Sequence, residues 1–182
     1  MIITTNQLLI RAFQSNDTEA VYQIGSNPEL TQPLNMTAFQ SDAEAQRFLQ
    51  MLQTDPDAWA LTLKTTQEVC GIVMLAPNLA ADQVSVAGYE LSFALLPAFQ
   101  KHGLMSTALP AIMQHYQQTQ AVTVFNAACF LDNRDSQKLL LKLGFQADYQ
   151  TQLPAYLGGQ TVQYFRYLII WKSTRLKRKC FH

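Results

Sequence analysis

The stretch that decides the fold reads Leu95-Leu96-Pro97-Ala98-Phe99-Gln100-Lys101-His102-Gly103-Leu104-Met105-Ser106-Thr107. It joins an apolar, strand-like segment to a helical one through a short loop with one glycine and the basic residues Lys101 and His102. The first turn of a helix leaves backbone N–H groups unpaired and therefore attracts anions, and Gly103 allows a phosphate to approach the backbone. The segment predicts a strand–loop–helix unit with an anion site, although an ordinary strand-to-helix turn has a similar composition.

Around this unit, the hydrophobic periodicity predicts alternating strands and helices without repeats or a linker. Strands are predicted over 8–13, 59–64, 69–75, 84–96, 122–130, 145–153 and 161–171, and helices over 18–26, 42–54, 104–118 and 133–143. The order of these elements indicates one domain built on a mixed α/β sheet.

Several local signals mark where these elements begin and end. Asn27-Pro28 is expected to end the first helix, and Ser41-Asp42-Ala43-Glu44 forms a capping box for the second. Trp59 to Lys64 alternates in the manner of a strand with one buried face. Pro110 is expected to kink its helix or to displace its start, and Gly158-Gly159 predicts a hairpin between the last two strands.

The composition excludes several classes of protein. The chain has 182 residues, of which 48% are hydrophobic and 14% charged, so it is long and apolar enough to bury a core. It contains no run of eighteen apolar residues, and its first residues do not resemble a secretion signal. The cysteines Cys70, Cys129 and Cys180 form no C-x-x-C pair, which favours reduced thiols and disfavours a zinc site. We therefore expect a cytoplasmic protein without a membrane span or a metal.

The zero net charge hides an uneven distribution along the chain. Residues 172–182 carry five of the thirteen basic side chains and no acid, which leaves 1–171 with eight basic and thirteen acidic groups, a net charge of −5. We expect a domain over 1–171 and a basic tail over 172–182. A solvated terminus is the favoured interpretation of the tail, with RNA or anionic lipid as the alternative. The acidic body makes a nucleic acid unlikely as the main ligand and is compatible with a cationic partner.

A second stretch adds to the first. Asp132-Asn133-Arg134-Asp135-Ser136 opens a helix that ends in Lys142-Leu143-Gly144-Phe145. Together with Gln100-Lys101-His102-Gly103-Leu104-Met105, it resembles motifs B and A of the GNAT superfamily of acetyl-CoA-dependent N-acetyltransferases. The resemblance runs from about residue 8 to 171, and the branch that acetylates N-terminal amines of ribosomal proteins (alanine and serine acetyltransferases) is the most similar. It implies the GNAT fold, a mostly antiparallel central sheet flanked by helices on both faces.

The resemblance also implies how acetyl-CoA would be held. The strand before the loop would diverge from its neighbour, and its free backbone groups at Phe93, Ala94 and Leu95 would pair with the pantetheine arm. The loop and the first helical turn would bind the pyrophosphate through Gln100, Lys101, His102, Gly103, Leu104, Met105 and Ser106. Asn133 would hydrogen-bond the cofactor near its thioester, and an ordinary N-cap role for Asn133 is equally expected.

The implied reaction is direct attack of a neutral amine on the thioester carbonyl. The N–H of Leu95 is the expected oxyanion donor, and Glu90 matches the acidic residue that accepts the proton of the amine through water. Ser136 matches a proposed acid that protonates the departing thiolate. Structural roles compete with both: Glu90 as an ion-pair partner and Ser136 as a first-turn helix residue. Alternative proton donors are Tyr89, Tyr156 and Tyr164, each more often a packing residue.

Several properties stay open at this stage. Lys101 stands where the family commonly has glycine, and it would either crowd or bind the pyrophosphate, so a non-catalytic CoA-binding module on the same fold is the alternative to an enzyme. The acceptor would be a protein N-terminus or a small-molecule amine, chosen by residues 30–39 and 148–159. The sequence leaves open whether the protein forms a homodimer.

Overall fold

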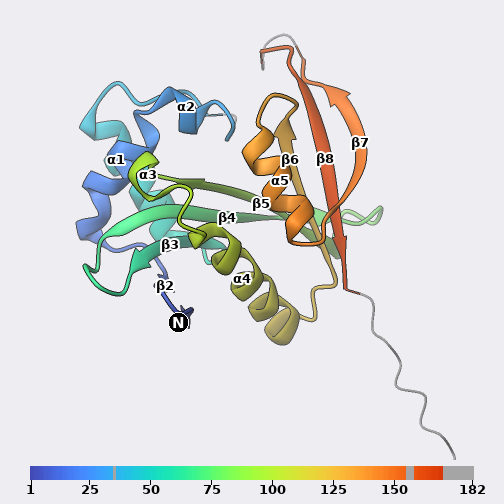
Figure 1. Cartoon of the computed structure of the whole chain (residues 1–182), viewed down its shortest axis with the longest axis horizontal. Helices are drawn as coiled ribbons and strands as arrows, with labels where there is room; N and C mark the ends of the chain where they lie inside the picture. Colours follow the sequence, from blue (N-terminus) through green and yellow to red (C-terminus); the bar gives the residue numbers. More distant parts are fainter. Residues whose placement is uncertain (35, 155–157, 170–182) are drawn as a thin grey trace, which may run out of the picture.

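A computed structural model describes residues 1–34, 36–154 and 158–169 of the chain (Figure 1). The strands are β1 (Ile2–Thr4), β2 (Leu8–Arg11), β3 (Ala58–Leu63), β4 (Val69–Leu79), β5 (Val86–Leu95), β6 (Val124–Phe130), β7 (Gln146–Gln152) and β8 (Thr161–Leu168). The helices are α1 (Thr18–Gly25), α2 (Pro28–Thr31), α3 (Asp42–Thr54), α4 (Leu104–Gln120) and α5 (Arg134–Lys142), with 3-10 turns at Ser15–Asp17 and Pro97–Phe99. None of the helices in the described ranges is long and apolar enough to cross a membrane.

Within the described residues, the strands form one eight-stranded sheet in the order β1-β2-β3-β4-β5-β6-β8-β7. Every neighbouring pair is antiparallel except β5 and β6, which are parallel because α4 connects them as a crossover. The predicted mixed, mostly antiparallel α/β sheet is confirmed. The short elements β1 and α2 were not predicted from the sequence.

Two hydrophobic cores lie on opposite faces of the sheet. One lies under α4 and α5, and the other lies under α1 and α3, as the arrangement of these helices in Figure 1 shows. Strand β3 contributes to both, because Trp59 and Leu61 belong to the first core and Ala58 and Ala60 to the second. The side chains of this strand alternate between the two faces as predicted, but both faces are buried, and small alanines fill the side under the N-terminal helices.

The parallel pair β5–β6 is the feature that positions the site. The two strands pair only from Tyr89–Phe125 to Leu91–Ala127. Beyond this point β5 continues beside β4, and β6 continues beside β8, so the sheet splits between them. Gly88 lies at the closed end of the split, where an added Cβ would stand 2.7 Å from the Val124 carbonyl oxygen. The strands thus converge at Gly88 and diverge toward Leu95.

An ion pair connects the start of the sheet to α1. Arg11, the last residue of β2, donates from Nη1 and Nη2 to the two carboxylate oxygens of Asp17 at 2.7 and 2.9 Å. The side chains of Arg11 and Asp17 are 13% and 4% exposed, and Asp17 also accepts the N–H of Gln14. This bidentate pair fixes the turn from which α1 begins.

Three local expectations are corrected. Pro28 is the first residue of α2, where its missing N–H costs nothing, so Asn27 is the N-cap of a new helix that begins soon after α1 ends. Ser41 makes no capping hydrogen bond, and the Glu44 carboxylate accepts the N–H of Gln40 instead. Helix α4 starts at Leu104 and continues through the exposed Pro110 to Gln120, so the proline does not displace its start.

The end of the chain is covered in part. β7 and β8 pair as an antiparallel hairpin, which confirms the prediction from Gly158-Gly159. Residues 155–157, which include Tyr156, lie outside the described residues, as do Trp171 and the basic tail 172–182. The predicted boundary between domain and tail stays a prediction.

Candidate active site

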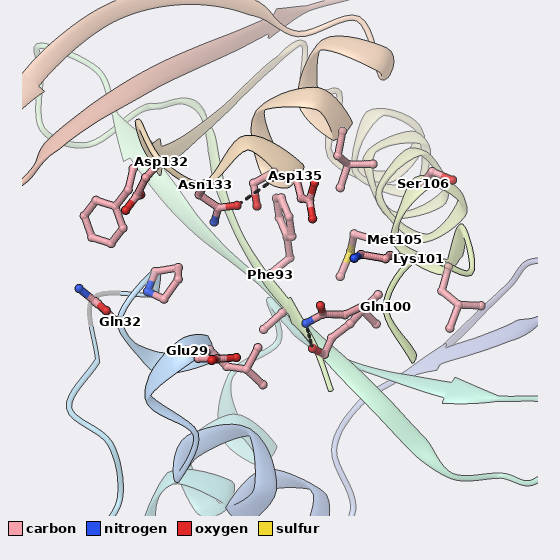
Figure 2. A pocket seen from close by; sticks show the side chains of 18 of the residues that line it. Glu29, Gln32, Phe93, Gln100, Lys101, Met105, Ser106, Asp132, Asn133 and Asp135 are labelled. Atoms are coloured by element: carbon pink, nitrogen blue, oxygen red, sulfur yellow. Dashed lines mark hydrogen bonds between the residues drawn. The ribbon is translucent and has the colours of Figure 1, made fainter. Parts of the chain in front are cut away.

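A cleft of about 780 Å³ opens where β5 and β6 diverge (Figure 2). Its walls come from β5, from the loop and first turn of α4, from α5, and from the segment around α2. Eleven of the residues proposed from the sequence as cofactor-binding or catalytic line it: Phe93, Ala94, Leu95, Gln100, Lys101, Gly103, Leu104, Met105, Ser106, Asn133 and Ser136. Two separate segments of the chain, 93–106 and 133–136, thus meet at one cavity.

The edge of β5 that faces the split offers free peptide groups. The N–H of Leu96 donates to the Cys70 carbonyl of β4 at 2.9 Å, so by alternation the peptide groups of Leu95 and Phe93 point away from β4, toward the split. The Gln100 side chain donates to the Leu95 carbonyl at 3.0 Å (dashed line in Figure 2). The carbonyl of Leu95 thus has a hydrogen-bond partner, and the N–H of the same residue points to the same side, toward the split.

The N-terminus of α4 carries a group of unpaired amides. Gly103 is its N-cap with a φ of 76°, and Lys101 adopts a φ of 64° in the loop before it. No backbone N–H of residues 101–106 donates a hydrogen bond to any residue that the structure describes. An added Cβ on Gly103 would meet only the Ser106 Oγ, at 3.7 Å, so the space in front of these amides is open. This turn has the geometry of an anion site.

The hydroxyl groups of this turn are directed inward. Ser106 Oγ donates to the Gly103 carbonyl at 2.7 Å, and Thr107 Oγ1 donates to the Leu104 carbonyl at 2.9 Å. Both hydroxyl protons are therefore used inside the turn. Only the amides and the oxygen lone pairs face outward.

The opposite wall is the first turn of α5. Asn133 is its N-cap, and the Oδ1 accepts the N–H of Ser136 at 3.1 Å. The same side chain lines the cleft, where Figure 2 shows it across from Gln100 and Phe93. The capping interpretation of Asn133 is thus confirmed, and it leaves the NH₂ group of the amide available to the cleft.

Charge is distributed unevenly along the cleft. Lys101 and Lys142 line it, and Figure 2 shows Lys101 near Met105 and Ser106 at the α4 end. Glu29 and Asp132 line the other end, where Gln32 also lies. The α4 end is suited to an anion because its free amides and the ammonium group of Lys101 add to one another; the carboxylate of Asp135 also lines the cleft. The far end is suited to a cation.

Glu90 and His102 lie outside the cleft lining. Glu90 is on β5, opposite Asn126 and just before the split, and it is partly buried. Burial raises the pKa of its carboxyl group above the ordinary value of 4.5. Its carboxylate makes no ion pair or hydrogen bond with the residues described. His102 is exposed on the loop and is not among the residues that line the cleft.

The other chemically active side chains have structural partners or a buried environment. Tyr89 donates its hydroxyl proton to Gln120 Oε1 at 2.8 Å, which connects β5 to the end of α4. Cys129 is buried, and burial raises its pKa to about 11, so it is protonated near neutral pH. Tyr164 is partly buried on β8.

Sequence reasoning missed most of the wall opposite α4. The lining residues that the sequence did not propose as cofactor-binding or catalytic are Glu29, Leu30, Gln32, Pro33, Phe130, Asp132, Asp135, Leu139, Lys142 and Gln160. A signal was present for two of these segments: residues 30–39 were expected to contact the acceptor, and Asp132 and Asp135 flank the cap Asn133. The sequence analysis did not predict that a second helix, α2, begins at Pro28, so it did not place Glu29 in the wall of the cleft.

Comparisons with known proteins identify the class of protein. The model of the acetyltransferase (GNAT) domain family matches residues 7–146. An uncharacterized N-acetyltransferase of Bacillus subtilis, YoaA, is 24% identical over 87% of this chain and 90% of its own length. A GNAT-family acetyltransferase structure from Bacillus anthracis superimposes with a TM-score of 0.81, at 19% identity, over 92% of this chain and 98% of that one.

A further structure bears on the cofactor. RimL, a ribosomal L7/L12 α-N-protein acetyltransferase in complex with coenzyme A, matches with a TM-score of 0.73 and 22% identity over 93% of this chain and 98% of that chain. Both structures share the fold of this chain, over 92% and 93% of its length. The chain belongs to the GNAT acetyltransferase family, and the resemblance to the ribosomal-protein branch drawn from its motifs is confirmed.

Proposed function

We propose that this protein transfers the acetyl group of acetyl-CoA to a primary amine by direct attack. The observation that carries the proposal is the row of unpaired amides at the start of α4, placed beside a strand edge whose peptide groups have no strand partner. An extended chain of amides that ends in a diphosphate is complementary to both features at once. CoA-bound relatives of the same fold support this assignment.

The residues of the cleft would divide the cofactor among them. The Leu95 and Phe93 peptide groups would pair with the pantetheine arm, and the amides of 101–106 would hold the pyrophosphate. Lys101 and Lys142 would add positive charge near the phosphates. When bound, acetyl-CoA supplies an acyl group that is activated as a thioester.

The remaining residues would handle protons and the developing charge. The Leu95 N–H faces the split and would stabilise the oxyanion. Glu90 would accept a proton from the ammonium group of the acceptor through water, and its raised pKa makes it a stronger base than an ordinary carboxylate. Ser136 lines the cleft and would donate a proton to the departing thiolate. In this scheme the C–N bond forms and the C–S bond of the thioester breaks. The nitrogen of the acceptor loses one proton to Glu90 before the attack and a second one to water after it, and Ser136 regains from that water the proton that it gives to the thiolate.

Lys101 bears on the alternative of a binding module without activity. Its φ of 64° is the left-handed conformation that glycine adopts easily, so this lysine keeps the backbone path at an energetic cost of about 1 kcal/mol. Since its side chain lines the cleft beside the free amides, we infer that it binds phosphate rather than blocks it.

The acceptor would carry a positive charge and a primary amine. Glu29 and Asp132 at the far end of the cleft support a cationic acceptor. The relatives named as ribosomal-protein acetyltransferases act on protein N-termini, which makes a free peptide N-terminus one candidate and a small amine the other.

The test has a binding part and a turnover part. Calorimetric titration with CoA should show one site, and mixing with acetyl-CoA and a panel of peptide and small amines should release CoA. Lys101→Ala should weaken CoA binding about tenfold, and the adjacent His102→Ala, outside the cleft, should leave it nearly unchanged. Binding without release of CoA for any amine would favour the module, and absence of CoA binding would overturn the whole assignment.

A further inference from the structure

The sheet half formed by β6, β8 and β7 has one face that lacks the helical cover of the rest. On β6, Phe125 and Ala127 belong to the core under α4 and α5, so Asn126 and Ala128 point to the opposite face. No described residue of β6, β7 or β8 belongs to the core under α1 and α3, which covers that opposite face elsewhere. We call the surface around Asn126, Ala128 and their neighbours the open face.

The cleft reaches this face through the split. Phe93 and Leu95 pack on the side of α4, whereas Ala94 belongs to the core under α1 and α3. All three line the cleft, and so does Phe130, which alternates with Cys129 on β6. The cavity therefore has walls from both faces of the sheet.

Glu90 lies on the open face, and no residue that the structure describes neutralises its charge. Its cross-strand neighbour is Asn126, and the next residue in the same row is Arg166 of β8. The Arg166 guanidinium is already paired, with Nη2 2.9 Å from Asp148 Oδ2. Within the described parts of the chain, Glu90 forms neither an ion pair nor a hydrogen bond.

One tyrosine lies near this carboxylate, and a second tyrosine stacks on the first. Tyr164 is opposite Ala128, whose side chain is small, and lies one cross-strand pair further along β6 than the row of Glu90, Asn126 and Arg166. Burial and the nearby charge of Glu90 raise the pKa of Tyr164, in keeping with that proximity. The ring of Tyr149 stacks on that of Tyr164, with centroids 4.6 Å apart and planes 9° from parallel, and Tyr149 is 51% exposed.

An irregularity in β7 produces this arrangement. The register between β7 and β8 shifts between Ala147 and Gln150, so Asp148 and Tyr149 are the unpaired residues of a bulge. Bulges re-aim side chains. Here the bulge directs Asp148 to Arg166 and Tyr149 to Tyr164. The bulge thus pairs Arg166 with Asp148, so Arg166 does not pair with Glu90. It also stacks Tyr149 on Tyr164, and the two rings form an aromatic wall.

We propose that Glu90, Tyr164 and Tyr149 form the subsite that selects the acceptor by its primary ammonium group and an apolar segment next to it. This inference rests on the proposed function and assigns its acceptor specificity. The carboxylate attracts the ammonium charge, and the tyrosine rings contribute cation–π attraction and an apolar surface. Tyr149 and Tyr164 are specificity-determining residues, and Glu90 holds the group that it later deprotonates.

The first experiment measures binding without turnover. The tyrosine ring signals of the CoA-bound full chain are followed by NMR during titration with benzylamine and with its uncharged counterpart, benzyl alcohol. Benzylamine should bind at least about tenfold more tightly. Glu90→Gln should remove the difference, Tyr149→Ala should weaken benzylamine about fivefold, and Leu168→Ala, another exposed residue of β8, should change nothing. Equal binding of the two ligands, or a Glu90→Gln variant that still prefers the amine, would overturn the subsite.

The second experiment measures kinetics and separates the two sources of the amine. Benzylamine represents a small amine, and a tripeptide with a free N-terminal serine, beside its N-acetylated form, represents a protein terminus. Tyr149→Ala should raise KM for the accepted amine severalfold and leave KM for acetyl-CoA unchanged. If acetylation occurs and substitution of Tyr149 or Tyr164 by alanine changes neither KM for the amine nor KM for acetyl-CoA, this inference fails and the proposed function stands. If benzylamine binds with the expected dependence and no amine is acetylated, the subsite stands and the enzymatic assignment fails.

Discussion

The two halves of the sheet differ in how their faces are used. The β2–β4 half, called the closed half, is buried on both sides, and its β3 contributes apolar side chains to two cores. The β5–β8 half, called the open half, is split along β5–β6. It carries the open face on β6, β8 and β7, and it is bordered by β7, whose residues are all exposed. Burial of apolar surface stabilises the first half, whereas the second half has backbone groups and a carboxylate without partners among the residues that the structure describes. We infer from the difference that one half supports the fold and that the other carries the proposed active site.

The largest effect is expected from the ion pair of the closed half. Asp17→Asn leaves the Arg11 guanidinium nearly buried without a counter-charge, which should lower the free energy of unfolding by about 3 kcal/mol. Its control is Asp148→Asn, which breaks the Arg166 pair at 50% and 34% exposure and should cost less than about 1 kcal/mol. Urea unfolding measures both. Similar losses for the two variants would remove this contrast between the halves.

A smaller effect, on binding, is expected from the α4 turn. Gly103→Ala forces a side chain into the left-handed region, at a φ of 76°, and places a methyl group before the free amides. CoA affinity measured by calorimetry should fall about tenfold. Gly158→Ala is the matched control, since Gly158 has a φ of 91° with nothing within 4 Å of an added Cβ. It should show a similar backbone penalty in stability and an unchanged CoA affinity.

The sequence predicted the local parts of this site better than the non-local ones. The α4 turn was predictable because Leu95 to Thr107 is continuous, and its chemistry depends on neighbours in the chain. Helix α2 was missed because Asn27-Pro28 fits both the end of one helix and the start of another. The pairing of Tyr149 with Tyr164 depends on a bulge whose register only the folded hairpin fixes. The same holds for the two-sided burial of β3, since alternation in one strand does not show what covers its second face.

A stabilising change is expected in the closed half. The hydroxyl oxygen of Thr62 on β3 is buried and has no hydrogen-bond partner in the described residues. Thr62→Val replaces that hydroxyl with a methyl group of similar volume, so the free energy of unfolding should rise by about 1 kcal/mol. Thr31→Val is the control. The Thr31 hydroxyl donates to the Asn27 carbonyl at 3.2 Å, so this variant should lose stability instead. Urea unfolding of both variants gives the comparison, and a loss at Thr62 would contradict it.

The smallest effect is a pH dependence in the open half. Burial raises the pKa of Glu90 in the folded protein, so the unfolded chain loses this proton at a lower pH than the folded one. Stability from this group is therefore full below the unfolded pKa and decreases as the pH rises toward the folded pKa. Glu90→Gln removes the titration, so its stability relative to the wild type should increase between pH 4 and pH 8, measured by urea unfolding at each pH. The exposed Glu19→Gln serves as the control and should show little trend. A Glu90→Gln variant whose relative stability falls with pH would mean that the carboxylate is stabilised by a partner in solution, and the open half would then not hold an unneutralised charge for its acceptor.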